Sequence, residues 1–351
     1  MGGPLHRVPA PGRSVANLTP GADLSLVTLA AIEAAAVLLR GVAIHTPLVP
    51  FGPLEARRYL KAESLQPIGA FKIRGAYAAI ATLSPVELAR GVITYSSGNH
   101  AQGVARAARL LGVPAVVVMP SDAPAIKRER VAADGAEIVV VGTAADERQQ
   151  VAEAIAAERG LTIIPPFDDD RIIAGQGTIG LELVEDLPEL AVVLVPVGGG
   201  GLASGVATAV RAIRPTARVI GVEPELAADA RDSLAAGEIV RWPADLASRT
   251  IADGTRTQAI GLRTFAHLRA YLDSVVTVSE VEIAAAVRLA AERSRLVVEP
   301  SGALGVAALA FHARELGLDR VEGPVVAIVS GGNVDPERYR TYLEAPVPPE
   351  G

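Results

Sequence analysis

Four consecutive glycines, residues 198–201, follow the apolar run AVVLVPV and precede a predicted helix. Glycine lets the backbone approach a ligand closely, and the free N–H groups at the start of a helix attract an anion. The stretch matches neither GxGxxG with an acidic residue at the expected distance nor GxxxxGKS/T, so a dinucleotide is disfavoured. It predicts a site for a single phosphate group, with a tight turn as the simpler alternative.

Two other polar loops follow predicted strands, SSGNHAQG from Ser96 and SGGNVD from Ser330. Ser96 and Ser97 can cap the helix that follows them, and with the next backbone N–H groups they form a neutral cradle that suits a carboxylate. A bare helix cap is the alternative, and His100 is expected to be a structural hydrogen-bonding residue. Ser330 ends a buried strand, where its hydroxyl can bond a ring nitrogen.

A lysine lies in the uncharged stretch QPIGAFKI, where Lys72 has Phe71 and Ile73 as neighbours. Burial disfavours the charged form of an amine, so its pKa falls and the free amine becomes a nucleophile for an aldehyde. A phosphate loop, a carboxylate loop, a buried lysine and a hydroxyl for a ring nitrogen together describe a pyridoxal phosphate enzyme. Taken alone, Lys72 can equally extend its charged end into solvent beside Arg74.

The composition limits the class of protein. At 351 residues the chain is long enough for two domains, and its net charge of -6 favours neither nucleic acid nor an anionic membrane as a partner. It has no cysteine, which excludes disulfides and thiolate metal sites. The uncharged stretch 191–210 contains Pro196 and the four glycines, so it predicts strand, loop and helix instead of a membrane span.

The elements that must position these residues alternate along the chain. Short β-branched runs such as GVITYS, AVVVMP, EIVVVG and LTIIPP are separated by longer helical stretches, and the alternation repeats through AVVLVPV, ARVIGVEP and VVAIVS. Two further helical stretches are expected between the last two of these strands. This pattern predicts an α/β fold with parallel sheets covered on both faces, and sites at the carboxyl ends of strands.

Six motifs occur in an order and spacing that resemble one family: QPIGAFKIRGAY, SSGNHAQGVA, FDDDRIIAGQGTIGLE, GGGGLASG, VVEPSGA and SGGNVD. They resemble the fold-type II pyridoxal phosphate enzymes of the serine/threonine dehydratase and serine racemase branch, over most of the chain. The resemblance implies a two-domain, tryptophan synthase β-like fold in which each domain is a mostly parallel sheet flanked by helices.

The same resemblance divides the chain. Residues 21–90 and 169–345 are expected to form a large cofactor-binding domain, and residues 91–168 a small domain. The ends are expected to be a disordered leader, 1–20, and a tail, 346–351. Because the leader lacks the apolar core of a signal peptide, a cytoplasmic protein is expected. The resemblance also implies a homodimer.

The resemblance assigns cofactor contacts. Lys72 resembles the lysine that binds the cofactor as a Schiff base, and Phe71 packs on the cofactor ring. Asn99 is expected to bond the ring hydroxyl and Ser330 the pyridine nitrogen. The phosphate is assigned to the glycine turn and the residue after it: Gly198, Gly199, Gly200, Gly201 and Leu202.

It also assigns the substrate and a metal. Ser96, Ser97 and His100 would line the substrate carboxylate site, and in the racemase branch the position of Ser97 faces the cofactor opposite the lysine, where it can exchange the α-proton. The stretch EPELAAD resembles the divalent-cation site of this branch. Its ligands would be oxygens suited to Mg²⁺ or Ca²⁺, from Glu223, Ala227 (backbone carbonyl) and Asp229.

The expected activity is an L-serine/L-threonine ammonia-lyase that eliminates water to give a 2-oxo acid and ammonia from a small amino acid. The alternatives are serine racemase and 3-hydroxyaspartate dehydratase; for the latter, Arg148 is a candidate cation for the second carboxylate. Ile68 and Ala70 replace hydroxyl residues that are common before the Phe-Lys pair, which puts the substrate preference in doubt. The chain ends soon after SGGNVD, so the regulatory domain of the isoleucine-pathway enzymes, and feedback by isoleucine, are not expected.

Overall fold

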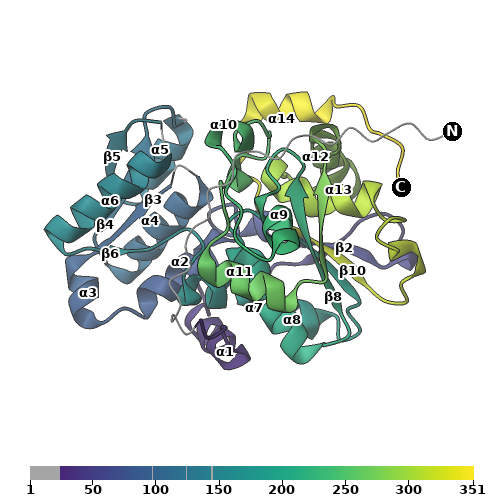
Figure 1. Ribbon diagram of the computed structural model, residues 1–351, viewed down its shortest axis with the longest axis horizontal. Helices are drawn as coiled ribbons and strands as arrows, with labels where there is room; N and C mark the ends of the chain where they lie inside the picture. The colour runs from purple at the N-terminus through teal and green to yellow at the C-terminus, as the bar shows by residue number, and fades with distance from the viewer. Residues whose placement is uncertain (1–23, 97, 124, 144) are drawn as a thin grey trace.

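The computed structural model describes residues 24–96, 98–123, 125–143 and 145–351, which contain two mostly parallel sheets with helices on both faces (Figure 1). This is the α/β fold that the sequence predicts. Within these residues, no helix has both the length and the apolar character needed to cross a membrane. The stretch 191–210 forms a strand, a turn and the start of a helix, as expected.

The larger sheet has the strand order β1-β2-β10-β7-β8-β9, and β1 is its antiparallel edge. Its strands are β1 (Leu48–Pro50), β2 (Arg58–Ala62), β7 (Val192–Pro196), β8 (Arg218–Pro224), β9 (Ser274–Val278) and β10 (Val325–Val329). The last strand in sequence, β10, lies in the middle, where Val325 pairs with Arg58 of β2 and with Val192 of β7. The carboxyl ends of β10 and β7 therefore lie next to each other.

The smaller sheet is wholly parallel, in the order β5-β4-β3-β6. Its strands are β3 (Val92–Tyr95), β4 (Ala115–Pro120), β5 (Glu137–Val141) and β6 (Thr162–Ile163). All four were expected from their β-branched runs, and all four fall within the segment expected to form the small domain.

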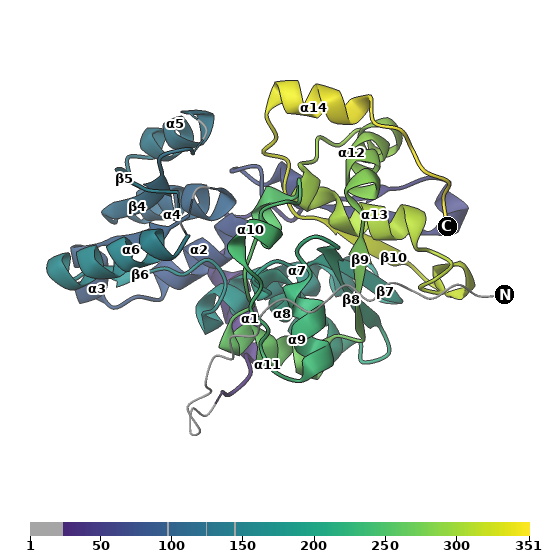
Figure 2. The same ribbon diagram turned by 45° about the horizontal axis from the view of Figure 1, so that its top comes forward.

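Apolar clusters fill both faces of each sheet. On the larger sheet, α12 and α13 cover one face, and α8 with α7 covers the other, as Figure 2 shows. On the smaller sheet, α2, α4 and α5 contribute to one cluster and α6 to the other. These helices are α2 (Lys72–Ala81), α4 (Asn99–Leu111), α5 (Ala125–Ala133), α6 (Ala145–Arg159), α7 (Asp170–Asp186), α8 (Gly201–Ile213), α12 (Glu280–Ser294) and α13 (Leu304–Phe311).

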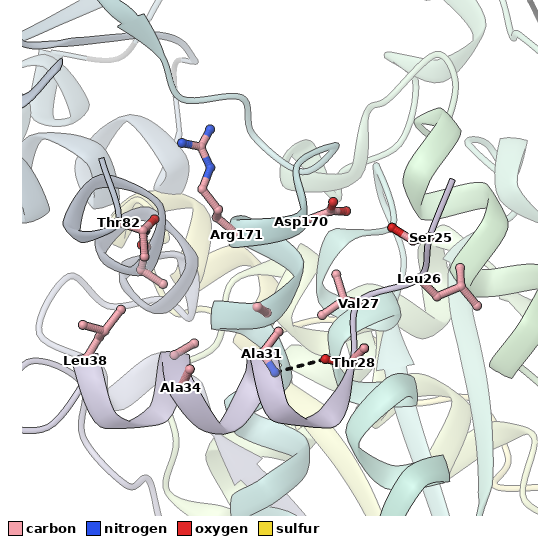
Figure 3. Close-up of a pocket in the computed structure, with 13 residues that line it drawn as sticks. Ser25, Leu26, Val27, Thr28, Ala31, Ala34, Leu38, Thr82, Asp170 and Arg171 are labelled. Atoms are coloured by element: carbon pink, nitrogen blue, oxygen red, sulfur yellow. Dashed lines mark hydrogen bonds between the residues drawn. The ribbon is translucent and has the colours of Figure 1, made fainter. Parts of the chain in front are cut away.

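Shorter elements complete the described chain. The α-helices are α1 (Leu29–Leu38), α3 (Pro85–Arg90), α9 (Asp229–Ala236), α10 (Ala244–Ala247), α11 (Leu262–Tyr271) and α14 (Pro336–Leu343). The 3-10 helices are η1 (Leu54–Ala56), η2 (Glu63–Leu65), η3 (Asp253–Thr255), η4 (Pro300–Ala303) and η5 (Leu318–Arg320). A pocket of about 390 Å³ opens between α1 and the start of α7, and none of the site residues predicted from the sequence lines it (Figure 3).

One part of the expected element order is wrong. The segment between ARVIGVEP and the last strand was expected to be helical, but it contains the strand β9, which pairs with β8 at the edge of the larger sheet. Its sequence SVVTV is β-branched, and its side chains alternate between exposed and buried. This is the pattern of a half-buried edge strand.

Candidate active site

The loop before α2 is joined to the end of β10. Ala70 forms an antiparallel bridge with Gly331, the Phe71 N–H donates to the Ser330 carbonyl at 3.1 Å, and the Gly332 N–H donates to the Gly69 carbonyl at 2.9 Å. Lys72, the first residue of α2, is thereby held beside Ser330. The structure thus brings together the predicted lysine and the predicted ligand of a ring nitrogen.

The Lys72 amine is partly buried and contacts the loop that follows β6. Its Nζ donates to the Pro166 carbonyl at 2.7 Å and lies 5.1 Å from the centroid of the Phe71 ring. Burial lowers the pKa of Lys72 to about 8, because no acidic partner in the described part of the chain offsets the loss of water. A large fraction of the amine is therefore uncharged in mildly alkaline solution, which is the form that can act as a nucleophile or a base.

A buried ion network anchors α2 just after the lysine. Arg74, with 1% of its surface exposed, donates through Nε and Nη2 to the Glu63 carboxylate at 2.8 Å each, and through Nη1 to Glu182 at 2.6 Å. Lys61, fully buried, pairs with Glu182 at 2.7 Å and donates to the Thr46 carbonyl at 2.7 Å. The two cations balance the two carboxylates, and the network links β2, η2, α2 and α7.

The glycine loop leaves the start of α8 open to an anion. Gly200 is the N-cap of this 13-residue helix, at φ +92°, and no side chain caps the first N–H groups. A Cβ on Gly200 would lie 2.8 Å from the Thr264 Cβ, and one on Gly199 would collide with the Phe167 ring. Glycine is therefore needed at these positions for conformation and space, and the donor set fits a phosphate.

The start of α4 differs in part from the expectation. The N-cap is Gly98, which has no side chain to accept a hydrogen bond, and the Ser96 hydroxyl accepts instead from the Gly98 N–H at 3.3 Å. Ser96 is therefore not the cap of α4, and Ser97 lies outside the described residues. The first N–H groups of α4 remain suited to a carboxylate.

His100 is a buried, neutral residue. Its Nε2 lies 3.0 Å from the Ile164 carbonyl, which can only accept, so Nε2 carries the proton. Burial, together with the charge of Lys72, lowers the pKa of His100 to about 3. In this tautomer Nδ1 offers no proton to a carboxylate, so any carboxylate at this end of α4 depends on hydroxyl and backbone donors.

Asn99 contacts two residues that sequence reasoning did not assign to the site. Its Nδ2 donates to the Glu299 carboxylate at 2.6 Å, and its Oδ1 accepts from Asn333 Nδ2 at 2.8 Å. Both partners belong to motifs named above, VVEPSGA and SGGNVD. The sequence feature that could have indicated Glu299 as a site residue is its position directly after the apolar run LVV. Ser330 is buried after β10, and its Oγ makes a long contact of 3.4 Å to the Ser301 carbonyl.

Two carboxylates from the EPELAAD stretch are buried next to each other. Glu223, near the end of β8, accepts from the N–H groups of Ala230 at 3.0 Å and Arg231 at 2.8 Å. Asp229 begins α9, and its buried Oδ2 has no hydrogen-bond partner within the described chain. Burial raises the pKa of Asp229 to about 8, and burial together with the charge of Asp229 raises that of Glu223 well above its ordinary value.

This pair fits a divalent cation. The cation would give Asp229 Oδ2 a partner, and its charge would offset two carboxylate charges that are costly to bury. The part of the chain that the structure describes has no group of three histidine, aspartate or glutamate side chains that could hold a metal. Backbone carbonyls, such as that of Ala227, and water would have to supply the other ligands.

A pH dependence of stability follows from these carboxyl groups in metal-free protein. Their native pKa values lie above those of the unfolded chain, so the native state binds more protons, and the stability they contribute at low pH is lost as pH rises. We expect the melting temperature to fall between about pH 4 and pH 8 from this cause.

Mg²⁺ or Ca²⁺ should restore stability at pH 8. At a free cation concentration of 100 times the dissociation constant, the free energy of unfolding should rise by about 2.7 kcal/mol. Thermal melts with and without cation and chelator measure this, and Glu223→Gln should blunt the response. A melting temperature that is indifferent to cation and chelator, in protein shown to be metal-free, would remove Glu223 and Asp229 as cation ligands.

Comparison with known proteins places this geometry in a family. A family model described as pyridoxal-phosphate dependent enzyme matches residues 39–331. The chain belongs to this family. The predicted dependence on pyridoxal phosphate is thereby confirmed. Three features of this chain fit the cofactor: the lysine of lowered pKa, the uncapped glycine turn and the buried serine after β10.

Relatives within the family are hydroxy-amino-acid enzymes. The chain is 44% identical over 290 residues to L-threo-3-hydroxyaspartate ammonia-lyase of Saccharomyces cerevisiae, covering 83% of this chain and 87% of the relative. It is 46% identical over 286 residues to L-threonine ammonia-lyase of Geobacter sulfurreducens, covering 82% and 69%. The structure of maize serine racemase matches with a TM-score of 0.85 and 37% identity, covering 91% and 98%.

The chain therefore belongs to the branch of serine/threonine dehydratases, hydroxyaspartate ammonia-lyases and serine racemases, as its motifs indicate. It is a hydroxy-amino-acid ammonia-lyase or racemase that depends on pyridoxal phosphate.

Proposed function

We propose that this enzyme is an L-serine/L-threonine ammonia-lyase. The observation that supports elimination most directly is the Lys72 amine, whose pKa burial lowers to about 8, held beside the buried Ser330 and near the start of α4. The 46% identity to L-threonine ammonia-lyase of Geobacter sulfurreducens favours the same substrates. The proposal includes a divalent cation at Glu223 and Asp229 that stabilises the fold and takes no part in the reaction.

When bound, pyridoxal phosphate supplies an electron sink for the carbanion that forms at the substrate α-carbon. The N–H groups at the start of α8 would hold its phosphate, Ser330 its ring nitrogen and Asn99 its ring hydroxyl. A serine hydroxyl is neutral and does not hold that nitrogen protonated, as an aspartate would.

The other steps belong to the chain's own residues. The N–H groups at the start of α4 bind the substrate carboxylate, and the uncharged Lys72 Nζ removes the α-proton. The substrate then loses its β-hydroxyl as water, which takes up the proton that Lys72 removed from the α-carbon. Hydrolysis of the resulting enamine gives the 2-oxo acid and ammonia.

Two alternatives share this site. Racemisation needs a second proton donor opposite Lys72, for which Ser97 is the candidate, and the likeness to maize serine racemase favours it. Elimination from 3-hydroxyaspartate needs a cation for the second carboxylate. The likeness to the relative from Saccharomyces cerevisiae favours this reaction. Arg148 stays the candidate cation for the second carboxylate, and its Nη1 donates to the Thr143 carbonyl at 2.9 Å.

A substrate panel distinguishes the three activities. We expect ammonia release from L-serine and L-threonine to exceed that from L-threo-3-hydroxyaspartate, and pyruvate from L-serine to exceed D-serine. Ser97→Ala should remove any D-serine formation and leave most L-serine dehydration, because Lys72 still reaches the α-proton. Faster turnover of hydroxyaspartate, or D-serine as the main product, would replace the proposal by the corresponding alternative.

A further inference from the structure

Glu299 is a buried carboxylate at the candidate site to which the mechanism above gives no role. It precedes η4, has 5% of its surface exposed, and its backbone N–H donates to the Gly331 carbonyl at 3.1 Å. The carboxylate lies against the Cα of Gly331, because a Cβ there would collide with Glu299 Oε1. Glu299 therefore occupies the space beside Ser330, next to the expected cofactor ring.

The side-chain amide of Asn99 has one orientation, set by a chain of donors and acceptors. Arg130 can only donate, and its Nη1 lies 2.6 Å from Asn333 Oδ1. Asn333 Nδ2 then faces the Ile68 carbonyl and Asn99 Oδ1, each at 2.8 Å. Asn99 Nδ2 consequently faces Glu299, which accepts at 2.6 Å.

Among the residues that the structure describes, this orientation leaves one hydrogen of Asn99 Nδ2 without an assigned acceptor. An amide nitrogen carries two hydrogens, and Glu299 accepts one of them. The other can donate to the oxygen of the cofactor ring hydroxyl. If the amide rotated by half a turn, its oxygen would face that ring oxygen, and Asn99 could no longer donate a hydrogen bond to it.

Ionisation of Glu299 is costly to the fold. Burial and the negative charge of Asp253 raise the pKa of Glu299 to about 7, opposed by Lys127 and by hydrogen bonds from Asn99 and Asn333. Lys127 is paired with Asp253 at 2.9 Å, so it is not a dedicated partner of Glu299. A buried acid without its own cation, at the edge of a site, is more typical of function than of stability.

We propose that Glu299 is a positioning residue for the cofactor, acting through Asn99: its carboxylate fixes the Asn99 amide so that Nδ2 donates to the ring hydroxyl oxygen. The proposal rests on the proposed function only in taking Asn99 as the ligand of that oxygen. It assigns Glu299 no contact with the substrate.

The test is a double-mutant cycle read out as the dissociation constant of pyridoxal phosphate, titrated into cofactor-free protein and followed by visible absorbance. Glu299→Ala should weaken cofactor binding about tenfold, the size of effect expected for losing one charge-assisted hydrogen bond. Glu299→Gln keeps an accepting oxygen and should recover most of that loss. In the Asn99→Ala background, Glu299→Ala should weaken binding by less than about twofold, because the group through which it acts is gone.

Two results would overturn the inference. One is cofactor affinity of Glu299→Ala equal to that of the unmodified protein. The other is an equal loss of cofactor affinity on Glu299→Ala with and without Asn99, which would show that Glu299 supports the fold and does not act through the amide. In that case the melting temperatures of the cofactor-free variants should also be lower. Failure of the proposed function would look different: the unmodified protein would bind the cofactor and release no ammonia from L-serine or L-threonine.

Discussion

Lys72→Ala should lower ammonia release by at least about 10²–10⁴-fold, the contribution typical of a positioned general base. The chain has three lysines, Lys61, Lys72 and Lys127. Lys61 is fixed between Glu182 and the Thr46 carbonyl, and Lys127 is paired with Asp253. Only Lys72 combines an amine free of an acidic partner in the described structure with a pKa lowered to about 8.

Borohydride reduction of the holoenzyme, followed by peptide mapping, tests whether Lys72 is the lysine that binds the cofactor, without relying on activity. The cofactor should be recovered on the peptide that contains Lys72, and Lys127→Ala should label like the unmodified protein. If Lys72→Ala kept a reduced adduct on Lys61 or Lys127, the assignment of the lysine would be wrong.

Arg74→Met should reduce the free energy of unfolding by about 3–5 kcal/mol, because removing the cation of a buried pair leaves uncompensated charge. Glu63 would then be fully buried without a directly paired cation, because the nearby Lys61 is itself paired with Glu182. Denaturant unfolding of the apoprotein gives this value directly.

Arg288→Met is the matched control for Arg74→Met. Arg288 pairs with Glu292 one helical turn away, with about a third of its side chain exposed, and such surface pairs contribute no more than about 1 kcal/mol. A loss at Arg74 no larger than at Arg288 would show that the buried network does not anchor α2.

Local patterns in the sequence predict much of this site. Strand, loop and helix can be recognised around Gly198–Gly201 because β-branched residues, glycines and small helical residues follow one another within twenty positions. The low pKa of Lys72 could also be expected, since its sequence neighbours Phe71 and Ile73 are apolar and become buried.

The remainder depends on contacts between residues far apart in the sequence. Glu299 and Asn333 meet Asn99 across some two hundred positions, so no local pattern indicates that they orient its amide. The cap of α4 was misassigned because serine is a strong N-cap residue, but here the turn places Gly98 at that position. β9 was missed because a short edge strand between helices gives little signal beyond its β-branched residues.

The central place of β10 determines when the chain can acquire its cofactor. During synthesis, β2 and the loop that carries Lys72 are made early, but both take their partners from β10 and the residues directly after it, near the other end of the chain. Pairing across so long a loop must overcome the entropy of closing it before any contact is gained. The nascent chain therefore lacks a complete candidate cofactor site until residues 325–332 have left the ribosome.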